Sequence, residues 1–142
     1  MIESTIILID DDQDDLDMLL DAIKGLQLKN EVITFDKSAN ALSYLQAKGS
    51  EQPFLILCDV NMPLMDGFEL RSRIYSDDKL KLKLVPFLFL STSYQPADIL
   101  RAYELSVQGY FKKPPTFVEL KELLQTIIAY WDKSYRPISR QR

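Results

Sequence analysis

The sequence predicts an α/β protein, built on a doubly wound, five-stranded parallel sheet with five helices. Two observations lead to this prediction: five short runs of almost entirely apolar residues, and a stretch with helical spacing after each run. Uninterrupted apolar runs are typical of parallel strands that helices cover on both faces, because neither side of such a strand meets water. In such sheets, functional residues gather beyond the carboxyl ends of the strands.

The first three strand–helix units occupy the first half of the chain. Their strands are expected at Thr5–Ile9, Val32–Phe35 and Phe54–Cys58. The first helix shows the spacing i, i+3, i+4, i+7, which places one apolar stripe on one helix face; the stripe consists of Leu16, Leu19, Leu20 and Ile23. The second helix is marked by Ala41, Leu42 and Leu45, and the third covers Phe68–Tyr75.

Two further units complete the pattern. The fourth strand is expected at Phe87–Leu90 and the fifth around Gly109–Phe111. The fourth helix is marked by Ile99, Ala102 and Tyr103. The last helix has the clearest stripe, which continues over four turns; it consists of Phe117, Leu120, Leu124, Ile127, Ile128 and Trp131.

Length and composition indicate one globular domain. A chain of 142 residues with 46% hydrophobic and 27% charged residues can bury one core. We expect the domain to span residues 1–132, followed by a short basic tail at 133–142 and no output domain. The connection Ser76–Leu84 is longer than its neighbours.

Charge and hydropathy exclude several classes of function. The net charge of −4 disfavours direct binding to nucleic acid. No apolar stretch is long enough for membrane insertion, and the one cysteine, Cys58, lies within an apolar run, so we expect a buried thiol and a cytoplasmic protein. The chain has no histidine, which excludes Ser/His/Asp catalysis and histidine-ligated zinc.

Polar residues follow four of the predicted strands. They are Asp10-Asp11-Asp12, Asp59, Ser91-Thr92 and Lys112-Lys113, the last followed by two prolines. Because parallel strands end at the same edge of a sheet, these side chains are expected to converge. Clustered carboxylates without histidine or thiolate favour a hard cation such as Mg²⁺. A hydroxyl at Ser91 and an ammonium at Lys113 suit a phosphoryl group.

Other acidic residues have simpler interpretations. We expect Asp12, Asp14 and Asp15 to cap and solvate the start of the first helix, and Asp66 to cap the third. An EF-hand loop beginning at Asp10 is disfavoured, because Asp15 occupies the position that requires glycine.

The segment Asp59-Val60-Asn61-Met62-Pro63-Leu64-Met65-Asp66-Gly67 resembles the phosphoacceptor segment of response regulator receiver domains in two-component signalling. The resemblance runs from about Thr5 to Trp131 and is strongest to single-domain, chemotaxis-regulator-like receivers. It implies a flavodoxin-like sheet with strand order 2-1-3-4-5.

By this resemblance, Asp59 is the phosphoacceptor and Asp10 and Asp11 form the acidic pair. Mg²⁺ would be held by Asp11, Asp59 and the backbone carbonyl of Asn61, with Asp10 acting mainly through water. Ser91, rather than Thr92, would be the switch hydroxyl, Tyr110 the switch aromatic, and Lys113 the phosphate-contacting lysine. The resemblance also implies a cis bond between Lys113 and Pro114, although Pro115 departs from the commonest pattern.

The resemblance implies a signalling domain and not an enzyme, although such a domain assists its own phosphotransfer and autodephosphorylation. The phosphoryl donor would be a histidine kinase or a histidine phosphotransfer protein, and the downstream target another protein. We expect a monomer or a weak homodimer. Two alternatives stay open: a haloacid-dehalogenase-type phosphatase with Asp10 as nucleophile and Asp12 as acid/base, and an interaction module that signals without phosphorylation.

Overall fold

The computed structural model describes residues 4–47, 49 and 51–137. Its five strands form one parallel sheet in the order β2-β1-β3-β4-β5, as predicted. The strands are β1 (Ile6–Ile9), β2 (Val32–Phe35), β3 (Leu55–Cys58), β4 (Phe87–Ser91) and β5 (Gly109–Lys112). The helices are α1 (Gln13–Lys24), α2 (Ser38–Gln46), α3 (Gly67–Tyr75), α4 (Asp78–Lys81), α5 (Pro96–Glu104) and α6 (Phe117–Lys133).

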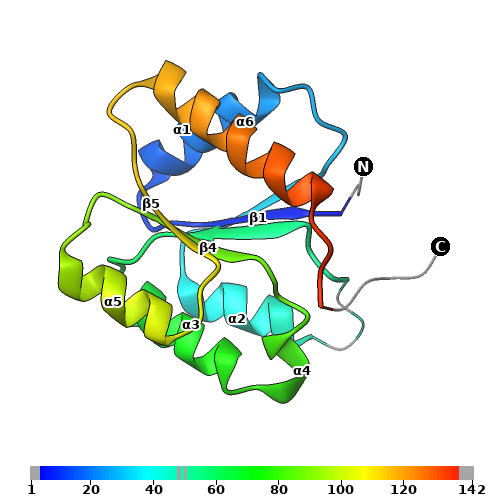
Figure 1. Ribbon diagram of the computed structural model, residues 1–142, viewed down its shortest axis with the longest axis vertical. Helices are drawn as coiled ribbons and strands as arrows, with labels where there is room; N and C mark the ends of the chain where they lie inside the picture. The colour runs from blue at the N-terminus through cyan, green and yellow to red at the C-terminus, as the bar shows by residue number, and fades with distance from the viewer. Residues whose placement is uncertain (1–3, 48, 50, 138–142) are drawn as a thin grey trace.

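The sheet forms the middle layer of three, with helices on both faces (Figure 1). Helices α1 and α6 cover one face, and α2, α3 and α5 cover the other. Successive residues of a strand point to opposite faces, so Ile6 and Leu8 of β1 pack in the cluster with α1 and α6, whereas Ile7 and Ile9 pack in the opposite cluster. Both faces of the central strands are therefore buried, as the apolar runs predicted.

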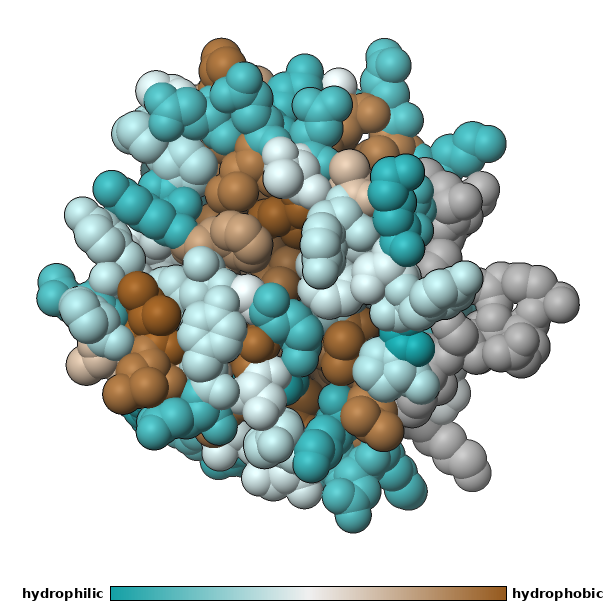
Figure 2. Space-filling model, in the orientation of Figure 1, coloured by the Kyte–Doolittle hydropathy of each residue, from teal (hydrophilic) through white to brown (hydrophobic). Residues whose placement is uncertain are grey.

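The edge strands differ from this expectation. In β2 and β5, most residues are only partly buried, because each of these strands has a neighbour on one side alone. Hydrophobic side chains gather in the hollow between β5 and α6 in Figure 2, where Phe111, Ile127 and Trp131 line a groove. Tyr103, which marked a predicted helix, is 52% exposed on α5. The residues that form the apolar pattern of the predicted strands and helices thus do not all enter the core.

The described residues form a sixth helix where five were predicted. The one-turn helix α4 lies within the long connection after α3. The Asp77 side chain caps it by accepting hydrogen bonds from the backbone N–H groups of Lys79 (2.9 Å) and Leu80 (3.2 Å). Leu80 is buried against the core, so this connection is packed onto the domain.

The start of α3 lies very close to the end of β3. Asp66 caps α3 by accepting a hydrogen bond from the Glu69 N–H at 2.8 Å, as predicted. The next residue is Gly67, where a Cβ atom would lie 2.3 Å from the Asp59 carbonyl oxygen. Only glycine fits this approach, which fixes the loop after Asp59 against the sheet.

Two buried arginines connect segments that are distant in the sequence. Arg71 is 1% exposed and donates hydrogen bonds to the carbonyls of Leu105 (2.9 Å) and Ser106 (2.8 Å), which ties α3 to the connection between α5 and β5. Arg136, beyond α6, donates to the Phe54 carbonyl at 2.7 Å. The first part of the predicted tail therefore packs on the domain, and residues 138–142 lie outside the described residues. Across the described chain, no helix is long and apolar enough to cross a membrane.

Candidate functional site

Three carboxylates meet where β1 and β3 end. Asp10 follows β1 and Asp59 follows β3, and the Asp59 N–H donates to the Ile9 carbonyl at 2.8 Å, which holds the two strand ends in register. One carboxylate oxygen from each of Asp10, Asp11 and Asp59 lies within 4.8 Å of the others. Asp10 and Asp59 are buried, whereas Asp11 is exposed. The predicted convergence of these residues is thus present, and it opens to solvent beside Asp11.

Burial makes the negative charge of this cluster costly. Desolvation raises the pKa of Asp10 to about 6, and the charge of Asp59 acts in the same direction, while hydrogen bonds from Lys113 and from the Asp12 N–H oppose it. Desolvation also raises the pKa of Asp59, against the opposing charge of Lys113. Oxygen ligands whose charges need neutralisation fit a hard divalent cation.

Lys113 brings a positive charge to this cluster from the loop after β5. Its ammonium nitrogen lies 2.7 Å from Oδ2 of Asp10, 2.7 Å from Oδ2 of Asp15 and 3.5 Å from Oδ2 of Asp59. The Lys113 backbone N–H donates to the Ser91 carbonyl at 2.8 Å and so holds the residue beside β4. Burial lowers the pKa of Lys113, but hydrogen bonds with Asp10 and Asp15 outweigh it and raise this pKa, so the side chain remains an ammonium.

The two carboxylate oxygens of Asp59, the phosphoacceptor candidate, have different surroundings. Oδ1 of Asp59 accepts a hydrogen bond from the Val60 N–H at 2.8 Å, and Oδ2 is the oxygen nearest to Lys113. Asn61 is exposed on the loop directly after the buried Val60. Contact of the Asn61 carbonyl with a metal stays a prediction.

Ser91 and Tyr110 lie on the neighbouring strands β4 and β5. Ser91 is fully buried, and its Oγ accepts a hydrogen bond from the Ser93 N–H at 3.1 Å, whereas Thr92 is exposed. Tyr110 is half-buried; its hydroxyl donates to the Ser93 carbonyl, and its ring lies edge-on to Phe89 with centroids 5.9 Å apart. Both residues therefore contact the same short segment after β4.

Two expectations from the sequence were wrong at this site. The Lys113–Pro114 bond is not cis; in the part of the chain that the structure describes, the cis peptide bond is Val85–Pro86. Trans is the favoured form even before proline, and Lys113 is already placed by its backbone hydrogen bond and ion pairs. Asp15 was expected to cap and solvate the start of α1, yet its carboxylate forms an ion pair with Lys113.

The sequence contains a signal that could have indicated the contact between Asp15 and Lys113. Asp15 lies four residues before Leu19, so the two share the helix face that carries the buried stripe. Asp12, in contrast, is the N-cap of α1, where its side chain accepts hydrogen bonds from the N–H groups of Asp14 and Asp15. The EF-hand alternative is excluded, because Asp14 and Asp21 lie within α1 and not in a metal-binding loop.

Comparisons with known proteins agree with this geometry. The family model of the response regulator receiver domain matches residues 6–125. The chain is 31% identical over 130 residues to response regulator Rcp1 of Synechocystis sp., covering 89% of this chain and 87% of that protein. It is 28% identical over 98 residues to the chemotaxis protein CheY1 of Helicobacter pylori, covering 69% of this chain and 76% of that protein.

Solved structures show the same fold. The crystal structure of the phosphorylated cyanobacterial phytochrome response regulator RcpA has a TM-score of 0.86 at 30% identity, covering 96% of this chain and all of that chain (100%). The Mn²⁺-bound form of response regulator Rcp1 has a TM-score of 0.82 at 29% identity, covering 95% of this chain and 99% of that chain.

Proposed function

Because the chain belongs to the response regulator receiver domain family of two-component systems, we propose that it accepts a phosphoryl group on Asp59 and signals by changing its protein contacts. Asp59 carries this proposal, because it is the carboxylate at the end of β3 that lies next to two further acidic groups and to the Lys113 ammonium. A receiver is a signalling domain, and its substrate is the phosphoryl group that it receives.

Mg²⁺ is the proposed cofactor. Asp11, Asp59 and the Asn61 carbonyl would hold it, with Asp10 acting mainly through water. The grouping of three carboxylates and the raised pKa values of Asp10 and Asp59 support a cation here, as does the Mn²⁺-bound form of the related Rcp1. When bound, the cation would neutralise the carboxylates and the oxygens of the incoming phosphoryl group.

The proposed reaction is a phosphoryl transfer from a phosphohistidine of a histidine kinase or histidine phosphotransfer protein. A carboxylate oxygen of Asp59 attacks phosphorus, and the new P–O bond forms as the P–N bond breaks. The bonding electron pair leaves with the donor imidazole nitrogen, and the product is an aspartyl phosphate. Lys113 would pair with the phosphoryl oxygens during the transfer. The same groups would assist autodephosphorylation by water.

Ser91 and Tyr110 are the proposed readout. A phosphoryl group on Asp59 would accept a hydrogen bond from the buried Ser91 hydroxyl. Thr92 is exposed, so Ser91 rather than Thr92 is the proposed donor. The segment after Ser91 carries the Ser93 carbonyl to which Tyr110 donates. A shift of Ser91 would therefore move the hydrogen-bond partner of Tyr110 and alter the surface that a downstream protein meets. We propose that the protein itself acts in the cytoplasm.

The two alternatives are less well supported. A haloacid-dehalogenase-type phosphatase would need Asp12 as acid/base, but the Asp12 carboxylate caps α1. An interaction module that signals without phosphorylation would not need Asp10, Asp59 and Lys113 to be in contact, as they are.

Incubation with acetyl phosphate and Mg²⁺ tests the proposal. We expect intact-mass spectrometry to show one phosphoryl adduct that is stable in acid and lost in base, and that depends on Mg²⁺. Asp59→Asn should remove the adduct, whereas Asp66→Asn, a carboxylate that caps α3, should retain it. An adduct that persists in Asp59→Asn would contradict the proposal.

A further inference from the structure

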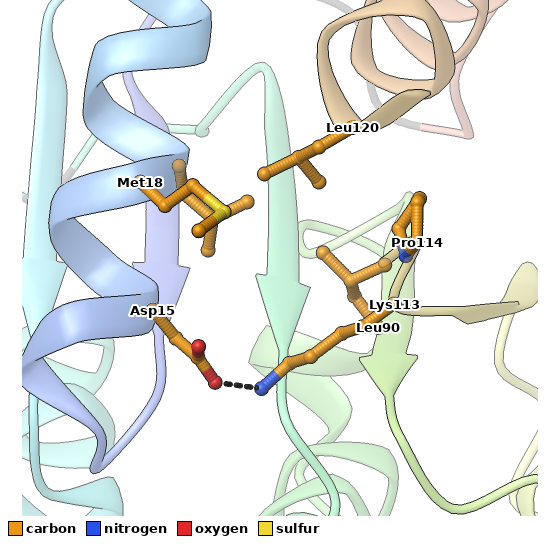
Figure 3. A pocket seen from close by; sticks show the side chains of 7 residues that line it. Asp15, Met18, Leu90, Lys113, Pro114 and Leu120 are labelled. Carbon is orange, nitrogen blue, oxygen red and sulfur yellow. Dashed lines mark hydrogen bonds and ion pairs between the residues drawn. The ribbon is translucent and has the colours of Figure 1, made fainter. Parts of the chain in front are cut away.

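Asp15 holds the lysine of the proposed phosphoryl site from outside that site. It lies in the first turn of α1, and Figure 3 shows its carboxylate directed at the Lys113 ammonium across a small pocket. The separation is 2.7 Å, equal to that between Lys113 and Asp10, whereas Asp59 is 3.5 Å from the same nitrogen. Lys113 is thus drawn toward Asp10 and Asp15 and away from the phosphoacceptor.

The surroundings strengthen this ion pair. The rest of the pocket is lined by Met18, Leu19, Leu90, Pro114 and Leu120. Apolar groups therefore replace part of the water around the two charges. The Lys113 side chain is only 13% exposed, and that of Asp15 is 37% exposed. Coulombic attraction increases where solvent is excluded. Asp15 therefore does more than favour the start of its helix.

An ammonium has three N–H donors. Two of those of Lys113 are used by Asp10 and Asp15 in the structure. A phosphoryl group on Asp59 would place several anionic oxygens near the same nitrogen, and these oxygens would compete with Asp15 for its donors. The charge of Asp15 would also repel them.

We propose that Asp15 is a positioning residue that competes with the phosphoryl group for Lys113 and so lowers the occupancy of the phosphorylated state. This inference rests on the proposed function of Asp59. It assigns to Asp15 a regulatory effect through Lys113, without contact with the reacting atoms. Removing the Asp15 charge should therefore make the phosphorylated state more favourable. If Asp15 only held Lys113 in place, removing this charge would instead make the phosphorylated state less favourable.

The test measures binding of beryllofluoride, an analogue of the phosphoryl group, by ¹⁹F NMR titration of the full chain at saturating Mg²⁺. Asp15→Asn should bind beryllofluoride about fivefold more tightly than the unmodified protein, the effect expected for a partly exposed ion pair. Asp14→Asn is the matched control, because Asp14 is exposed in the same helical turn and its substitution removes the same charge. Its affinity should be unchanged.

A second measurement needs no metal or analogue. In the free protein, the ¹H–¹⁵N signal of the Lys113 ammonium should shift in Asp15→Asn and stay in place in Asp14→Asn. Asp15→Gln removes the same charge and serves if Asp15→Asn does not fold.

Equal or weaker affinity in the folded Asp15 variants would overturn the role of Asp15 while leaving the proposed function intact. Equal tightening in Asp14→Asn would also overturn it, because the effect would then come from net charge. Failure of the unmodified protein to bind beryllofluoride would instead overturn the proposed function.

Discussion

The burial of Asp10 predicts an unusual pH dependence of stability for the metal-free protein. Its pKa rises from 3.8 to about 6 on folding, mainly because burial removes water from the carboxylate. Below about pH 4, Asp10 is protonated in both the folded and unfolded states. Between about pH 4 and 6 the unfolded state loses this proton first, so the free energy of unfolding falls as the pH rises. Above about pH 6 this decrease in the free energy of unfolding is complete.

The size of this effect follows from the shift. One pKa unit corresponds to about 1.4 kcal/mol, so Asp10 should lower the free energy of unfolding by about 2 to 3 kcal/mol between pH 4 and pH 7. Asp10→Asn removes the titrating group. Its free energy of unfolding, relative to the unmodified protein, should therefore increase by this amount over the same pH window.

Urea denaturation followed by circular dichroism, at several pH values in the presence of EDTA, measures this difference. Asp14→Asn is the control, because it removes an exposed carboxylate from α1. Addition of Mg²⁺ at neutral pH should stabilise the unmodified protein, by about 2.7 kcal/mol at a concentration a hundredfold above the dissociation constant. If the difference in free energy of unfolding between Asp10→Asn and the unmodified protein does not change with pH, the effect ascribed to the burial of Asp10 is refuted.

Three further substitutions, two of them paired with a control substitution, test the site and its support. Gly67→Ala should lower the free energy of unfolding by about 1 to 3 kcal/mol in urea denaturation, because the new Cβ would lie 2.3 Å from the Asp59 carbonyl oxygen; unchanged stability would contradict this packing. Arg71→Met should lower the free energy of unfolding by about 1 to 3 kcal/mol in the same assay, because it removes the hydrogen bonds that the buried guanidinium donates to the Leu105 and Ser106 carbonyls. Arg73→Met, which breaks an exposed ion pair, should cost less than about 1 kcal/mol. Ser91→Ala should weaken beryllofluoride binding about tenfold in ¹⁹F NMR titrations, since a hydrogen bond to a charged acceptor is lost; Thr92→Ala should not, and the reverse result would reassign the hydroxyl.

The sheet was predictable from sequence because its central strands are buried on both faces. Ile6–Ile9 and Leu55–Cys58 are continuous apolar runs, which is the pattern expected of parallel strands between two helical layers. The carboxyl ends of such strands meet at one edge, so the proximity of Asp10 and Asp59 followed from the topology alone.

Other features depend on contacts that no local pattern shows. Helix α4 is a single turn, too short for an apolar stripe, and its burial rests on Leu80. Asp15 was a reasonable helix-start residue by local rules, and its contact with Lys113 comes from a partner 98 positions away in the chain. The partial exposure of β2 and β5 reflects their place at the sheet edges, which strand composition does not encode.

We propose that Asp59 receives the phosphoryl group, and chemical trapping tests this claim most directly. The protein is treated with acetyl phosphate and Mg²⁺, reduced with borohydride, which converts an aspartyl phosphate to homoserine, and sequenced by tandem mass spectrometry. We predict homoserine at position 59 and intact aspartate at Asp10 and Asp11. Homoserine at Asp10 or Asp11, or at no position, would contradict the claim.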